Sequence, residues 1–334
     1  MKTGSVFVFW LFYAAALVAQ QPESSEPALQ TINLYAPLVL YSPKDRTLPS
    51  SIDWYLARST LWCFNATTKK RDCLASGEQT NQRCGGILDQ NHMRYSGITC
   101  GLPEIDSEHY RDKSRKRGFF LQATGADIRS GAPDSGQWVT YYSVHPTDSG
   151  GWVVAYWRFY PYNNGWHGIG DHEGDWEATE VVFDRDMKPL SLALLGHRHI
   201  KEVPWKEIKL SETHPLIYAE PVGHTSKVAG EGPLNRFIRH ETWSSGTVRW
   251  PDGHVTPSGG LAPLGIRSSP AQRALQYTGL WGSIHSRLLH NFGYWGPAFN
   301  ETDETKTGFI RAWCLHWEQG GESECFTIPL PIRR

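Results

Sequence analysis

The chain has 334 residues with 33 basic and 34 acidic side chains, which give a formal net charge of −1. This balance excludes the basic surface typical of nucleic-acid binding. Fifteen Trp, 14 Tyr and 13 Phe stand beside 32 Gly and 21 Pro, and this mixture favours short strands joined by turns. The composition therefore predicts a mainly β protein.

The N-terminus has the pattern of a secretory signal. Lys2 is followed by an apolar run over residues 6–18 and by a small residue, Ala19. We expect a signal peptide over 1–19 and a polar linker over 20–30. The run is shorter than the roughly 20 residues that a membrane span needs, and no later stretch is long and apolar enough. Secretion is the expected fate; an uncleaved anchor and the vacuolar lumen remain as alternatives.

Two elements are predicted at the start of the single domain expected over 31–334. Residues 34–41 form an apolar strand candidate, and a short helix follows Leu48, capped by Ser50 or Ser51 with Asp53 in its first turn. A disulfide-rich insertion of loops is expected at about 60–102. The charge run over 111–117 is read as a solvated loop or, through Lys116-Arg117, as a dibasic processing site.

Six cysteines in a chain with a signal sequence indicate disulfide bonds. They are Cys63, Cys73, Cys84, Cys100, Cys314 and Cys325. We expect the last two to pair across a C-terminal hairpin and the first four to pair among themselves, with three connectivities open. Two N-glycosylation triplets begin at Asn65 and Asn300 and fit the same secretory route.

From residue 137 onward, strand-like runs follow one another. They are predicted at 138–144, 152–160, 177–183, 191–196 and 215–220, with a final hairpin over 309–317 and 325–329. Residues 225–280 are rich in Gly and Pro and have weak periodicity, apart from a possible short helix over 272–285. No internal repeat is found.

The segment Gly170–Glu177 places four acids and a histidine within seven consecutive residues. If Asp175 and Glu177 begin a strand, the two-residue period puts both carboxylates on one face and Trp176 on the other. His172 would reach the same point from the preceding turn. One imidazole with several carboxylates suits Ca²⁺, Mg²⁺ or Mn²⁺ better than a structural zinc site. The alternative is a solvated polar hairpin.

Other histidines are weaker candidates. His197 lies two residues before His199 at a strand end, where the pair could be metal ligands, acid–base groups or loop residues bonded to backbone and water. His224 follows Gly223. The chain lacks a nucleophile elbow, a phosphate-binding loop and a dinucleotide fingerprint, which argues against a serine hydrolase or a nicotinamide-dependent oxidoreductase.

Several segments together resemble a known family. They are Tyr35–Pro43, Leu48–Trp54, Tyr156–Asn163, Gly170–Glu177, Gly223-His224, Gly279–Gly282 and Gly296-Pro297. In this order they resemble the family related to vacuolar protein sorting protein 62, found in fungi and plants. The acidic core is also similar, more distantly, to the necrosis-inducing cytolysins of plant pathogens, because it keeps the His-x-x-Asp-Trp-Glu part of their motif.

The resemblance implies a β-sandwich with long disulfide-bonded loops, a few short helices and a divalent cation at one end. Carried over, the cation ligands are His172, Asp175, Glu177 and a turn residue, Asn163 or Asn164. The cytolysins have Asp in that turn, so the amide brings one charge less, for which Asp171 and Glu173 could compensate. The resemblance also places His224 near the cluster. Gly174 stands where the cytolysins have a second histidine, which puts cytolytic activity in doubt.

Three functions are compatible with these features. The first is a secreted, possibly toxin-like protein that uses the cation to bind a glycan, a lipid head group or another small molecule. The second is a metal-dependent hydrolase, lyase or cyclase, in which His224 or His197 is the acid–base partner. The third is a structural secreted or vacuolar protein. A β-sandwich supports all three.

Overall fold

The structure is a computed structural model of the chain. It describes residues 27–41, 45–65, 70–88, 118–147, 149–165, 170–196, 199–220, 223–228 and 280–286, together with short strands at 244–245, 247–249, 255–257, 261–263 and 291–292. Among the helices in these ranges, none has the length and apolar character needed to cross a membrane.

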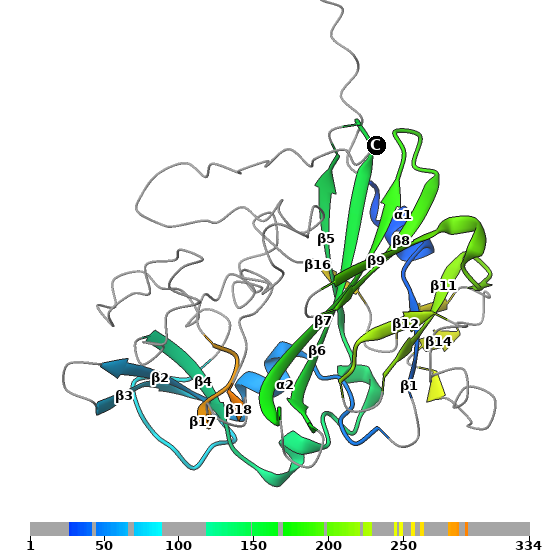
Figure 1. Ribbon diagram of the computed structural model, residues 1–334. Helices are drawn as coiled ribbons and strands as arrows, with labels where there is room; N and C mark the ends of the chain where they lie inside the picture. Colours follow the sequence, from blue (N-terminus) through cyan, green and yellow to red (C-terminus); the bar gives the residue numbers. More distant parts are fainter. Residues whose placement is uncertain are drawn as a thin grey trace, which may run out of the picture.

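A six-stranded sheet forms the centre of the fold (Figure 1). Its order is β16-β5-β6-β7-β8-β9, and all neighbours from β5 to β9 are antiparallel. The strands are β16 (Leu261–Pro263), β5 (Thr140–Pro146), β6 (Trp152–Asn163), β7 (His172–Phe183), β8 (Pro189–Gly196) and β9 (His199–Pro204). The long partners β6 and β7 are almost entirely buried, because both faces of the sheet are covered.

A second sheet covers one face of the central sheet, which confirms the sandwich predicted from the sequence. It contains β10 (Leu210–Ser211), β11 (His214–Ala219), β1 (Leu38–Tyr41), β13 (Ser244–Ser245) and β12 (Ser226–Val228). The interface between the two sheets, called the second-sheet core, contains Tyr41 and Ile217 on one side and Tyr156, Tyr160 and Val181 on the other. β1 and β11 run parallel, so distant parts of the chain end side by side.

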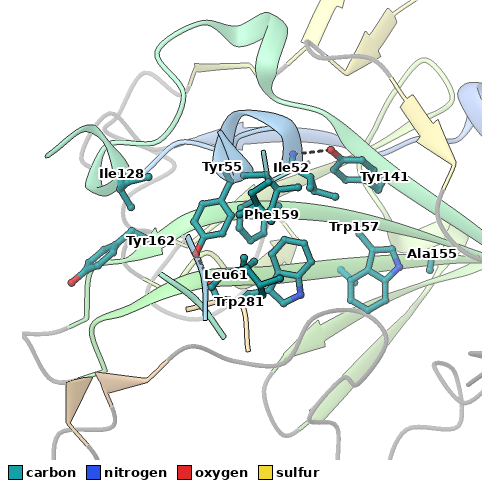
Figure 2. Packing of buried hydrophobic residues seen from close by; sticks show 14 of the residues in the cluster. Ile52, Tyr55, Leu61, Ile128, Tyr141, Ala155, Trp157, Phe159, Tyr162 and Trp281 are labelled. Atoms are coloured by element: carbon teal, nitrogen blue, oxygen red, sulfur yellow. Dashed lines mark hydrogen bonds between the residues drawn. The ribbon is translucent and has the colours of Figure 1, made fainter. Parts of the chain in front are cut away.

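The opposite face of the central sheet carries an aromatic core, which Figure 2 shows from close by. The three-stranded sheet β3-β2-β4 and the helix α2 (Ile52–Leu56) pack here. Tyr141 of β5 accepts a 3.0 Å hydrogen bond from the Ile52 amide, and Tyr55 donates one of 2.6 Å to the Trp281 carbonyl. Ser51 caps α2 by accepting from the Trp54 amide, as the sequence predicts.

Two regions differ from the sequence-based expectations. A short helix, α1 (Leu29–Leu34), precedes β1, where an extended strand was expected from residue 34. The segment expected to be loops also contains β2 (Ser59–Asn65) and β3 (Lys70–Ser76), and β4 (Gly118–Ala123) completes their sheet. The loop prediction was wrong for 60–65 and 70–76 because the Gly- and Asn-rich composition begins only after Ser76. Alternation and aromatic side chains favour strands before it.

The remaining secondary structure is short. It comprises the 3₁₀ turns η2 (Ala126–Arg129), η3 (Ser135–Gln137) and η4 (Trp205–Glu207), and the two-stranded pairs β14 (Thr247–Arg249) with β15 (Val255–Pro257) and β17 (Ile284–Ser286) with β18 (Asn291–Phe292).

The structure shows one of the expected disulfides in full. Cys73 is bonded to Cys84 between β3 and the following loop, and Cys63 on β2 is disulfide-bonded as well. Several other predictions fall outside the described residues. These are the signal peptide, the Lys116-Arg117 processing site, the cysteines Cys100, Cys314 and Cys325, the glycosylation triplet at Asn300, and His197.

Candidate functional site

The motif found in the sequence forms the first half of β7, and its residues divide between the two faces of the central sheet. Asp175 and Glu177 lie opposite Tyr160 and Arg158 on β6 and face the second sheet. Trp176 packs against Phe159 in the aromatic core. The predicted alternation of the two carboxylates and the tryptophan is therefore present. The strand begins earlier than expected, at His172.

Gly174 brings His172 to the same face as Asp175. Residues three apart in a regular strand point to opposite faces. Gly174 has a left-handed φ of 68°, and this conformation interrupts the alternation. The Nε2 atom of His172 then lies 4.0 Å from Oδ1 of Asp175. A Cβ atom at Gly174 would lie 1.9 Å from the Trp281 carbonyl oxygen, so a side chain cannot be accommodated there.

Asn163 joins this group from the end of β6. It lies directly opposite His172 in the β6–β7 ladder and is 8% exposed. Its Oδ1 atom is buried and has no hydrogen-bond partner among the described residues. An amide oxygen in this state costs free energy unless an ion or water satisfies it. Asn163 is thus the better placed of the two predicted turn ligands.

His224 reaches the cluster from the turn before β12. Its Nδ1 atom lies 2.9 Å from Oδ2 of Asp175, and its ring stacks on Tyr160 with centroids 3.9 Å apart and an interplanar angle of 5°. The residue is fully buried and has a left-handed φ of 51°. A hydrogen bond of 2.8 Å from its amide to the Glu220 carbonyl helps to hold this conformation. A non-glycine residue in this region is often part of a functional site.

Asp45 and Arg158 belong to the same cluster, and sequence reasoning missed both. Oδ1 of Asp45 lies 3.5 Å from Nε2 of His224, so the imidazole is held between two carboxylates. Arg158 is 1% exposed, and its Nη2 group donates to Ser226 on β12. Asp45 follows β1 in the sequence without any motif around it. Arg158 lies inside an apolar run that reads as core.

The positive and negative groups of the cluster affect each other strongly. Burial raises the pKa of Glu177 well above its ordinary value, and Asp175 raises it further, while Arg158 and His224 act in the opposite direction. Burial alone lowers the pKa of His224. The attraction of Asp175 and Asp45 outweighs this effect, and the net result raises the pKa of His224 to about 9. The two carboxylates therefore favour the protonated form of the imidazole.

Two other predicted ligands lie apart from the cluster. Asp171 accepts a 3.2 Å hydrogen bond from the Tyr162 hydroxyl and lies 3.6 Å from Nη1 of Arg129. Asn164 donates to Oγ1 of Thr47 and to the Arg129 carbonyl. These residues form a polar rim at the ends of β6 and β7, and Arg129 is 61% exposed there. We call Arg129, Asn164 and Asp171 the rim.

Glu173 of the same motif has a structural role. It faces the aromatic side, where its Oε2 atom accepts hydrogen bonds from the amides of Ala123 and Ser283 at 3.1 and 3.2 Å. It therefore connects three segments of the chain through backbone hydrogen bonds. These hydrogen bonds explain the burial of this acid without a bound ligand.

The cluster has the donor types that a hard divalent cation prefers, namely carboxylate and amide oxygens with one imidazole. Besides Asn163, Asp45 has a buried oxygen, Oδ2, that the described part of the chain leaves without a hydrogen bond. Within the described residues, however, no three His, Cys, Asp or Glu side chains converge closely enough to coordinate one ion as they stand. The chemical types of the donor atoms suit such a cation. The side chains would have to rotate before their donor atoms could coordinate one ion.

The same geometry bears on acid–base chemistry. Both ring nitrogens of His224 face carboxylates, and the ring is covered by Tyr160. An imidazole held in this way acts as an ion partner; a catalytic role for His224 would require it to turn toward a substrate. That role, like that of His197, stays a prediction.

Comparisons with known proteins give a distant structural similarity and no sequence relationship. No model of a known protein family matches the sequence, and no curated protein matches it. The resemblance to the family related to vacuolar protein sorting protein 62 therefore stays a prediction.

Among solved structures, one similar fold is necrosis and ethylene-inducing protein 2 from the causal agent of witches' broom disease of cocoa. Its TM-score is 0.34 at 14% identity, and the match covers 62% of this chain and 71% of that one. Two others are NLPPya in complex with glucosamine (TM-score 0.33, 16% identity, 47% and 66% covered) and in complex with mannosamine (TM-score 0.31, 18% identity, 43% and 59% covered). In both NLPPya complexes the match spans less than two thirds of the other chain. The structure thus has a distant similarity to the fold of these necrosis-inducing toxins.

Proposed function

We propose that this chain is a secreted ligand-binding protein in which the buried cluster takes one divalent cation, Ca²⁺, Mg²⁺ or Mn²⁺, and a glycan or lipid head group binds at the rim. Asp175, Glu177, His172 and Asn163 are the ligand residues on β6 and β7. The role of the cation is to hold the ends of these strands, and the role of the rim is to contact the ligand.

The observation that carries this proposal is the Asn163–His172–Asp175 arrangement. Gly174 breaks the strand alternation, and this places an imidazole beside a carboxylate and opposite an amide oxygen that is buried without a described partner. Packing alone does not require a polar group at each of these positions. Oxygen donors of mixed charge next to one imidazole match the coordination chemistry of these cations.

Burial decides which role the cation would have. Asp175, Glu177 and His172 are at most 3% exposed, so a ligand on the surface does not touch them directly. The rim is accessible and is joined to the ends of β6 and β7, where Asn164 directly follows Asn163. A cation that fixes Asn163 would therefore also fix the rim. This favours binding over turnover, because a covered cation offers no open position for activating water.

Calorimetry on the purified chain, freed of metal by a chelator, tests the proposal. We expect one cation per chain for the wild type. Asp175→Asn and Glu177→Gln should both abolish this binding while the far-ultraviolet circular dichroism stays unchanged. Glucosamine and vesicles of phosphatidylcholine with an anionic lipid are the first ligand probes, each titrated with and without the cation.

Glu173→Gln is the matched control, since Glu173 lies on the same strand and is also buried but faces away from the cluster. It should bind the cation as the wild type does. A wild type that takes up no cation would contradict the proposal and leave His224 and Arg158 as the charge partners of the acids. Equal binding by all variants would place the cation elsewhere.

A further inference from the structure

Arg129 is an exposed residue whose backbone and side chain are both held in place. The hydroxyl of the buried Thr47 donates a 2.7 Å hydrogen bond to the Arg129 carbonyl, and the side-chain amide of Asn164 donates to the same carbonyl at 3.3 Å. The guanidinium lies over the ring of Tyr162, with Cζ 4.4 Å from the ring centroid. A surface arginine ordinarily loses side-chain entropy when it binds a ligand. These contacts have already restricted Arg129, so less entropy remains to be lost.

The hydrogen-bond donors of this guanidinium are unused within the described part of the chain. Nη1 lies 3.6 Å from Oδ2 of Asp171, which is longer than a hydrogen bond, and that oxygen accepts from the Tyr162 hydroxyl at 3.2 Å. The contact with the Tyr162 ring involves the charge of the guanidinium and none of its N–H groups as hydrogen-bond donors. An exposed ion pair adds little stability by itself. The guanidinium is therefore suited to an acceptor that comes from outside the chain.

The charges around Arg129 favour an anionic partner. Asp171 offsets one positive charge, and Arg46, which is exposed on the segment that bonds the Arg129 carbonyl, adds another. Asp127 lies on the same 3₁₀ turn as Arg129, but it is paired with Arg58 at 2.7 Å. Two arginines and one carboxylate thus remain at this end of β6 and β7, and their sum is positive.

We infer that the rim binds an oxyanion of the ligand, a phosphate or a carboxylate group, and that Arg129 is the residue that selects it. A planar guanidinium donates two parallel hydrogen bonds to such a group, and a neutral or cationic sugar lacks the matching pair of charged oxygens. Tyr162 and Asp171 orient the guanidinium. The inference rests on the proposed function only in that the ligand binds at the rim, and it does not require the cation.

Calorimetric titrations of the wild type, Arg129→Gln and Arg129→Lys test the inference. Glucose 6-phosphate and glucuronate are the anionic probes, and glucose and glucosamine are their neutral and cationic counterparts. We expect the wild type to bind an anionic probe more tightly than either counterpart. Arg129→Gln should bind that probe roughly 10–100-fold more weakly, the range for loss of hydrogen bonds to a charged group. Arg129→Lys should lie between the two, because it keeps the charge and loses the planar pair of donors.

Arg185→Gln is the matched control. Arg185 is also exposed and donates to the Ser149 carbonyl at 3.4 Å, but it follows the other end of β7. This variant should bind every probe like the wild type. Vesicles of phosphatidylcholine with and without phosphatidate identify the source of the oxyanion. Binding to phosphatidate that depends on Arg129 assigns the oxyanion to a lipid head group, and binding to the soluble anionic sugars alone assigns it to a glycan.

The inference and the proposed cation can fail separately, so each titration is made on metal-free and on Mg²⁺-saturated protein. Three results would overturn the inference and leave the cation proposal standing. These are equal affinity of Arg129→Gln and the wild type, tighter binding of glucose or glucosamine than of the anionic sugars, and no binding of any anionic probe. A wild type that takes up no cation but binds an anionic probe through Arg129 would overturn the cation proposal and support the inference.

Discussion

The buried acids on the two faces of β7 have different surroundings. On the second-sheet face, Asp175 and Glu177 lie among His224, Arg158 and other polar groups. On the aromatic face, Glu180 is fully buried, both of its oxygens lack hydrogen bonds to described residues, and its neighbours across the sheet are Ala155 and Ala193. Burial raises the pKa of Glu180 to about 8. The acids thus have polar and charged neighbours on one face and apolar neighbours on the other.

This contrast teaches that an acid in a strand is not by itself a sign of a site. Glu173 and Glu180 lie within a few residues of Asp175, yet one bonds backbone amides and the other contacts apolar groups. The second-sheet face differs because oppositely charged residues from β6, from the turn before β12 and from the segment after β1 meet there. A candidate site differs from a structural acid because residues from separate segments compensate its charge.

The largest effect on stability is expected for Gly174→Ala. Gly174 is the residue at which the side-chain alternation between the two faces of β7 is interrupted. The new methyl group would meet the Trp281 carbonyl, and the left-handed φ would be strained. The free energy of unfolding should fall by more than roughly 5 kcal/mol, in the range of exceptional single substitutions. Denaturant unfolding checks this. A loss below about 1 kcal/mol would show that the strand tolerates regular alternation here.

Asp175→Ala tests the second-sheet face of β7. It removes the carboxylate 2.9 Å from Nδ1 of the buried His224 and leaves the 3.5 Å contact with Asp45, so it should cost roughly 3–5 kcal/mol of unfolding free energy, as expected when one member of a buried ion pair is removed. The measurement is urea unfolding in the presence of chelator at pH 7. His224→Gln in the same background should recover part of the loss. A variant as stable as the wild type would mean that the pair does not contribute.

Glu180→Met tests the opposite face and should stabilise the protein by about 1–3 kcal/mol at pH 8.5, since an apolar group of similar shape replaces an unsatisfied one. The folded pKa is raised from 4.5 to about 8, so the folded state retains a proton that the unfolded state has lost. Wild-type stability from this residue is complete below pH 4.5 and is lost as the pH rises to about 8.

The advantage of Glu180→Met over the wild type should therefore grow between pH 5 and pH 8. Parallel urea unfolding curves of both proteins at half-unit pH intervals measure it. A constant difference would show that Glu180 titrates at its ordinary pKa, and that a partner outside the described residues stabilises its charged form.

The smallest effect is expected for Glu173→Gln, which keeps an acceptor oxygen for the Ala123 and Ser283 amides but loses the charge. The free energy of unfolding should fall by about 1 kcal/mol, the size of the difference between a charged and a neutral hydrogen bond. Thermal and denaturant unfolding provide the check. A loss as large as that of Asp175→Ala would remove the distinction between the two faces.

The sequence by itself determined the local features of this protein. Alternating and aromatic runs predicted β6 and most of β7, the aromatic-rich composition predicted a mainly β fold, and Ser51 with Asp53 marked the start of α2. It also predicted that Asp175 and Glu177 share a face. These features depend on the period of a strand and on capping chemistry, which act over a few neighbouring residues.

Only the tertiary structure decided which distant residues meet Asp175. Asp45 and His224 reach it because β1 and β12 both lie next to β11 in the second sheet, an order that local patterns do not encode. The space for a side chain at Gly174 is taken by the carbonyl of Trp281, which lies far along the chain. Burial of Glu180 depends on both faces of the central sheet being covered. Strand periodicity is a local property, whereas charge compensation and burial depend on which segments the sheets bring together.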